Sequence, residues 1–96
     1  MFGLFKKQSS FNSPEEKLQH DMRRKIENLA MLIYNKSDLK GTAMGGYAMI
    51  DGINQAEEFY SKRSIAISEE YNVSRKKTIN IINDCARYVY KENINY

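Results

Sequence analysis

Residues 13–36 read SPEEKLQHDMRRKIENLAMLIYNK, and this stretch decides the fold class. Ser13 is a favourable N-cap residue, Pro14 suits the first helical position because its missing N–H has no partner there, and Glu16 completes a capping box. Apolar side chains then recur at spacings of three and four residues, which places them on one helix face; they are Leu18, Met22, Ile26, Leu29 and Ile33. The stretch therefore predicts an amphipathic helix from Pro14 to about Lys36.

Further helices are predicted downstream. A second apolar stripe predicts a helix over about 47–61, and the segment 62–71 extends it or forms a separate helix. Ser74 is a favourable cap for a last helix over about 75–91. The side chains expected on the buried side of that helix are Thr78, Ile81, Ile82, Cys85 and Val89. Residues 38–46 contain three glycines and are predicted as a loop or frayed first turn, with a continuous helix from Asp38 as the alternative.

The predicted fold is all-α, a small bundle of three to four helices. A chain of 96 residues supports one modest core, so we expect residues 13–96 to form a single helical bundle domain. Residues 1–12 are expected to form a flexible N-terminal arm. The content of 42% apolar and 28% charged residues and the mean hydropathy of -0.65 are typical of a globular chain with a broad solvated surface. No apolar run approaches the ~20 residues of a membrane span. A single cysteine, Cys85, excludes an internal disulfide, so we expect a cytoplasmic protein.

The segment 68–82, SEEYNVSRKKTINII, connects the last two predicted helices through a tight turn. It resembles a helix-turn-helix module, which has a small residue, a turn residue, an apolar residue and a helix cap at fixed places. The residues at those four places are Ser68, Asn72, Val73 and Ser74. There are two departures: Asn72 replaces the usual turn glycine, although asparagine tolerates a left-handed backbone, and Thr78 replaces an aliphatic residue.

Three basic residues, Arg75, Lys76 and Lys77, open the last predicted helix and are the candidate nucleic-acid contacts. At this position their side chains can reach phosphates or base edges of duplex DNA. The alternative is an ordinary turn between helices, since cations oppose the positive end of a helix dipole. The net charge of the whole chain is +3, which is small for a nucleic-acid-binding protein.

Tyrosine is the unusual residue in the composition, with seven tyrosines and no tryptophan. Tyrosine is favoured at protein interfaces, and the candidate interaction face is Tyr47, Tyr60, Tyr88 and Tyr90. The function expected first is therefore that of a small non-enzymatic protein acting through protein–protein interaction, with a protein partner or as a homo-oligomer. The alternative is a DNA-binding regulator using residues 64–91. A less favoured third function is a peripheral membrane adaptor using the apolar and basic residues 2–7.

Catalytic, cofactor and metal sites are not expected. His20 is the only histidine, and a metal site needs three or four converging ligands. Cys85 lies on an apolar stripe, which is typical of an inert buried thiol. The glycines between Gly41 and Gly46 lack the Gly-Lys-Ser/Thr ending of a phosphate-binding loop. We therefore expect no small-molecule substrate, and a membrane partner is less favoured than a protein or DNA partner.

Overall fold

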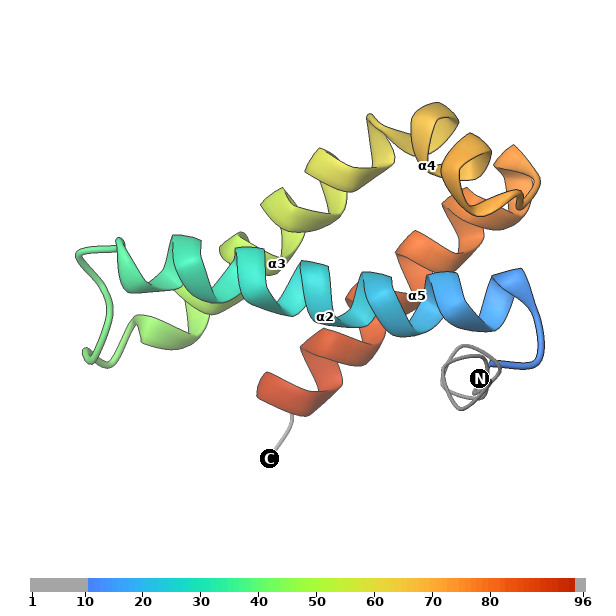
Figure 1. Ribbon diagram of the computed structural model, residues 1–96. Helices are drawn as coiled ribbons and strands as arrows, with labels where there is room; N and C mark the ends of the chain where they lie inside the picture. The colour runs from blue at the N-terminus through green and yellow to red at the C-terminus, as the bar shows by residue number, and fades with distance from the viewer. Residues whose placement is uncertain (1–10, 95–96) are drawn as a thin grey trace, which may run out of the picture.

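The computed structural model describes residues 11–94, and over them it confirms the predicted small all-α bundle (Figure 1). In chain order the helices are α2 (Pro14–Asn35), α3 (Gly45–Ser61), α4 (Ser64–Tyr71) and α5 (Arg75–Asn93). Helices α2 and α3 run in opposite directions, α5 packs against both, and the short α4 lies over the beginning of α5 (Figure 1). Of the predicted flexible arm, residues 1–10 lie outside the described residues.

The start of α2 follows the predicted capping pattern with one correction. The Ser13 hydroxyl accepts a hydrogen bond from the Glu16 N–H at 3.1 Å, which confirms the N-cap. The Glu16 carboxylate, however, accepts from the N–H of Asn12 and not from that of Ser13. Ser13 is extended (φ -153°, ψ 162°), and this conformation brings the preceding N–H over the first helical turn.

Helix α3 begins two residues earlier than predicted, at Gly45, and the alternative of a continuous helix from Asp38 is wrong. Gly41 has a positive φ of 78°, which a helix does not contain, and the Tyr34 hydroxyl accepts a hydrogen bond from its N–H at 3.4 Å. The segment 62–71 proves to contain a separate helix, α4, so the larger of the two predicted helix numbers is correct for the described residues.

The core lies where α2, α3 and α5 meet. Its fully buried side chains include Leu18, Met22, Ile26, Ile82 and Val89. Gly52 allows α3 to touch α2, because a β-carbon there would lie 2.8 Å from the carbonyl oxygen of Ala30. Ile81, predicted to be buried, is only half-buried, since it lies about 100° around α5 from Ile82. None of the described helices is both long and apolar enough to cross a membrane.

Candidate nucleic-acid interface

The turn between α4 and α5 is built around Asn72. Its backbone is left-handed (φ 57°, ψ 46°), a conformation that asparagine adopts at lower cost than most residues with a β-carbon. The reversal lets the Val73 N–H donate to the Ser68 carbonyl at 3.0 Å, the outer hydrogen bond of a Schellman motif. It also buries the Val73 side chain. Asn72 therefore takes the role that glycine has in the helix-turn-helix pattern.

Three hydroxyl side chains at the junction of α4 and α5 each have a hydrogen-bond partner. Ser68 is buried and donates to the Ile65 carbonyl at 2.7 Å. Ser74 accepts from the Lys77 N–H at 3.2 Å, which confirms it as the N-cap of α5. Thr78 is fully buried and donates to the Ser74 carbonyl at 2.9 Å. Because its hydroxyl is satisfied locally, Thr78 fits a position where an aliphatic residue is usual.

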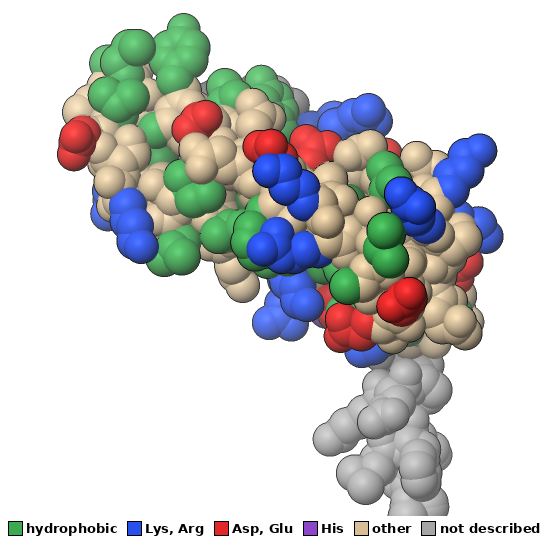
Figure 2. Space-filling view, turned by 90° about the horizontal axis from the view of Figure 1, so that it is seen from above, with side chains coloured by type: hydrophobic (Ala, Val, Ile, Leu, Met, Phe, Trp, Pro, Cys, Tyr) green, Lys and Arg blue, Asp and Glu red, His purple; other side chains and the backbone are tan. Residues whose placement is uncertain are grey.

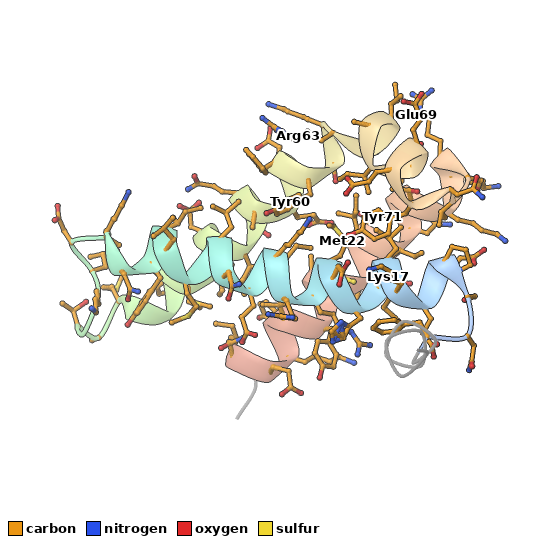
Figure 3. The ribbon with its side chains drawn as sticks, viewed as in Figure 1. Lys17, Met22, Tyr60, Arg63, Glu69 and Tyr71 are labelled. Atoms are coloured by element: carbon orange, nitrogen blue, oxygen red, sulfur yellow. The ribbon has the colours of Figure 1, made fainter. Side chains whose placement is uncertain are left out.

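Helix α2 braces this helix-turn-helix unit through two polar contacts. The Tyr71 hydroxyl donates to Asp21 Oδ2 at 2.6 Å, and Figure 3 shows Tyr71 between α4 and α2. Burial raises the pKa of Tyr71, and the hydrogen bond to Asp21 raises it further. At the start of α2, Lys77 Nζ lies 3.3 Å from Glu15 Oε2. The pKa of Glu15 is lowered by a hydrogen bond from its own backbone N–H and then by Lys77. These contacts fix the beginning of α5 relative to α2.

The three candidate nucleic-acid contacts are all exposed, but they are not equivalent. Lys77 points towards α2 and is paired with Glu15. Within the described part of the chain, Arg75 and Lys76 form no ion pair. Among the described residues, the unpaired cations at the start of α5 are therefore Arg75 and Lys76, whereas Lys77 is paired with Glu15 of α2.

A polar strip continues from Lys76 along one face of α5 and reaches the hollow that α5 shares with α3. We call it the α5 outer strip; its members are Lys76, Asn80, Asn83 and Arg87. Spacings of four, three and four residues place all four on one helix face. Asn83 is half-exposed and the other three are exposed. Arg87 also lies 3.5 Å from Asp84, an acidic neighbour of the strip. Sequence reasoning missed the last three members, although their helical spacing from Lys76 was a usable signal.

On the face drawn in Figure 2, charged and hydrophobic side chains are mixed but unevenly distributed. Figure 2 shows Lys and Arg side chains mostly over the middle of the molecule and the end near α4, whereas hydrophobic side chains gather at the end where α2 joins α3. Near α4, Arg63 stacks on the Phe59 ring with its guanidinium carbon 3.6 Å from the ring centroid. Lys62 pairs with Glu58 at 3.3 Å. The cations at the junction of α3 and α4 are thus already engaged within the chain.

The four tyrosines of the candidate interaction face lie in different surroundings. Tyr47, in the first turn of α3, is 65% exposed, whereas Tyr60 is half-buried against the core. Tyr88 faces α2, where the guanidinium of Arg23 lies 3.8 Å from its ring centroid. Tyr90, about 200° further around α5, faces α3 instead. The structure therefore does not bring the four into one surface.

The other sequence candidates show no site. His20 lies against the Phe11 ring, with the ring centroids 5.1 Å apart, and beside Asp21. Among the residues that the structure describes, no group of three His, Cys, Asp or Glu side chains is placed to hold a metal ion. Burial raises the pKa of the Cys85 thiol to about 11, so the thiol is protonated at neutral pH. The possible membrane segment, residues 2–7, lies outside the described residues.

Comparison with known proteins gives no match: no family model matches the sequence, and no curated protein or solved structure matches the chain.

Proposed function

We propose that this protein is a small, non-enzymatic DNA-binding protein that inserts the first half of α5 into the major groove of duplex DNA. The observation that carries the proposal is the α5 outer strip, which begins directly after a helix-turn-helix corner. An α-helix fits the major groove, and such corners present the first turns of the second helix to base edges. Lysine, asparagine and arginine are the residue types that read those edges.

The exposed residues divide into two roles by position. Arg75 and Lys76 lie at the start of α5, where free cations and backbone N–H groups meet phosphates. Asn80 lies one turn further along, and an asparagine in the major groove can form two hydrogen bonds with the edge of an adenine. Arg87 lies farther along the same face and contacts the opposite backbone or a guanine. Base reading is thus assigned to Asn80 and phosphate contact to the cations around it.

The charge of the interface predicts weak binding of duplex DNA by a single copy of the chain. Three cations face the DNA in this arrangement: Arg75 and Lys76, which have no ion pair within residues 11–94, and Arg87, which is weakly paired with Asp84; the charge of Lys77 is balanced by Glu15. Each phosphate contact contributes about 0.9 to the dependence of log affinity on log salt, so the slope should be about -2.7. A single copy of the chain is therefore expected to bind weakly and to lose duplex DNA readily as salt rises.

The direct test is fluorescence anisotropy with a labelled duplex of mixed sequence at about 50 to 200 mM salt. The double variant Lys76→Ala with Asn80→Ala should weaken binding at least tenfold. The matched control is Asn35→Ala with Lys36→Ala, which removes the same residue types from exposed positions at the end of α2. Absence of binding at the lowest salt refutes the proposal, and so does an equal loss in both double variants.

Protein–protein interaction is a second function that the surface favours. Several large hydrophobic side chains are at least 39% exposed, the most exposed being Tyr47, Leu32 and Ile65. Exposed apolar patches on small proteins are often contact sites. For either function we place the protein in the cytoplasm. The reason is that Cys85, the only cysteine of the chain, is a buried free thiol, and a chain without disulfides does not need an oxidising compartment.

A further inference from the structure

A hollow of about 490 Å³ is formed by one face of α2, by Tyr88 of α5 and by Phe11, which precedes α2. We call it the α2–α5 hollow. Its volume is within the range of ~300–1,000 Å³ that is usual for small-molecule sites. Tyr88 lies about 100° around α5 from Arg87, the last member of the α5 outer strip. The hollow is therefore a different surface from the face assigned to DNA.

Two aromatic rings line the α2–α5 hollow, and each packs against a nitrogen-containing side chain of α2. The Phe11 ring lies against the His20 ring, with the centroids 5.1 Å apart. The guanidinium carbon of Arg23 lies 3.8 Å from the Tyr88 ring centroid, and Tyr88 remains 40% exposed. Partly open aromatic rings and stacked guanidinium groups are the surfaces on which proteins pack nucleobases.

Two arginines of the hollow, Arg23 and Arg24, lack acceptors. Neither forms an ion pair within residues 11–94, and the remaining residues, 1–10 and 95–96, contain no Asp or Glu. The Nε atom of Arg23 is buried and has no hydrogen-bond partner in the part of the chain that the structure describes. A buried donor without an acceptor is costly, and guanidinium groups bind phosphate oxygens through paired hydrogen bonds. The missing acceptors therefore suit a phosphate group.

Two carboxylates also line the hollow, and they restrict the ligand further. Glu16 accepts a hydrogen bond from the Asn12 N–H, and Glu27 accepts one from the Asn93 side-chain amide at 3.2 Å. A carboxylate has about four lone-pair sites, so both can accept more donors. Their charges balance those of the two arginines, so a simple anion gains little here. A suitable ligand offers donors as well as a phosphate, as a nucleobase with an amino group does.

We propose that the α2–α5 hollow binds a nucleotide whose base carries an amino group. The phosphate is held by Arg23 and Arg24, the base packs against the exposed part of the Tyr88 ring, and Glu27, one turn after Arg23, accepts from the amino group. The same chemical group occurs in a free mononucleotide and at the phosphorylated end of a single strand. The hollow is open at the surface, so a free mononucleotide should bind with a dissociation constant of about 0.1 to 1 mM.

The test is an NMR titration of the full chain with guanosine monophosphate, in which amide signals within residues 16–27 and at Tyr88 should shift. Three matched ligands each lack one recognised group: guanosine lacks the phosphate, ribose phosphate lacks the base, and inosine monophosphate lacks the amino group. Each should bind at least fivefold more weakly. Absence of shifts at these residues overturns the proposal, and so does ribose phosphate binding as tightly as guanosine monophosphate.

Variants then locate the contacts. Arg24→Gln should weaken binding of guanosine monophosphate at least fivefold, and Lys25→Gln is the matched control, because Lys25 is the adjacent exposed cation and does not line the hollow. Tyr88→Leu should also weaken binding about fivefold or more, since it removes the stacking ring, whereas Tyr88→Phe keeps the ring and should bind within twofold of the wild type. Equal losses in the Arg24 and Lys25 variants, or none in Arg24→Gln and Tyr88→Leu, overturn the proposal.

A single-stranded guanine oligonucleotide with a terminal phosphate distinguishes the two sources of the ligand. Affinity equal to that of guanosine monophosphate assigns a free nucleotide, and at least tenfold tighter binding that Arg24→Gln removes assigns a strand end. Loss of guanosine monophosphate binding in Lys76→Ala with Asn80→Ala would place the nucleotide on the DNA face and overturn the proposal. The nucleotide site does not rest on the DNA function, since duplex binding is measured separately and responds to different residues.

Discussion

The sharpest consequence of the structure is that neighbouring lysines at the start of α5 differ in their value for DNA binding. Lys76 is exposed with no ion pair among the described residues, whereas Lys77 lies 3.3 Å from Glu15. Replacing Lys76 by Ala removes one phosphate contact. One phosphate contact contributes about 0.9 to the slope of log affinity against log salt, so screening that contact by raising salt from about 0.1 M to about 1 M lowers the affinity ~8-fold. Lys76→Ala removes the same contact altogether. The variant should therefore bind ~8-fold more weakly at about 0.1 M salt, a loss of about 1.2 kcal/mol of binding free energy.

Lys77→Ala should cost less than about twofold, because the charge of Lys77 is already balanced by Glu15 and faces α2. The converse change is more informative. Glu15→Gln releases Lys77 and removes a nearby negative charge, so affinity for duplex DNA should rise by up to ~8-fold. The fold should be little affected, since the pair is accessible to solvent, with the Lys77 side chain 64% and the Glu15 side chain 40% exposed.

The assay is fluorescence anisotropy with one duplex over a series of salt concentrations. The slope of log affinity against log salt should become shallower by about 0.9 in Lys76→Ala, stay unchanged in Lys77→Ala and become steeper in Glu15→Gln. Glu92→Gln is the control, because it removes an exposed acidic group from the other end of α5. Equal losses from the two lysine variants, or no gain from Glu15→Gln, would refute the reasoning.

Three further predictions concern the fold that holds the interface. Gly52→Ala should lower the free energy of unfolding by about 1–2 kcal/mol in urea, because its β-carbon would lie 2.8 Å from the Ala30 carbonyl oxygen; an unchanged midpoint would contradict this close contact. Tyr71→Phe should cost about 1 kcal/mol by removing the hydrogen bond to Asp21, again measured in urea, and an equally stable variant would show that the bond is unimportant. The Cys85 thiol, with its pKa raised from 9.0 to about 11 by burial, should resist iodoacetamide at pH 8 until the chain unfolds. The thiol of the unfolded chain ionises at a lower pH than the thiol of the folded chain. The contribution of Cys85 to the free energy of unfolding is therefore complete below about pH 9 and is lost as the pH rises to about 11, which urea unfolding curves at several pH values would reveal.

The helices were largely predictable because the signals that define them are local. Ser13 and Ser74 satisfy N–H groups within one turn, and apolar spacing is a property of consecutive residues. The left-handed turn at Asn72 was accessible for the same reason. The start of α3 was harder to predict, because Gly45 and Gly46 disfavour a helix, which forms there nonetheless with Gly45 packed against the side chain of Tyr34.

The candidate sites depended on contacts between residues far apart in the chain. Nothing local distinguishes Lys77 from Lys76; the difference comes from Glu15, more than sixty residues earlier, which the packing of α2 on α5 brings within 3.3 Å. Likewise, the tyrosines resemble one another in sequence, but the angle of each around its helix decides whether it meets Arg23, the core or solvent. Periodicity and capping act over a few residues and so specified the all-α class and its helices from the sequence alone. Which charges are free and which faces are open is decided only when the helices pack, because electrostatic pairing and burial depend on distance in space.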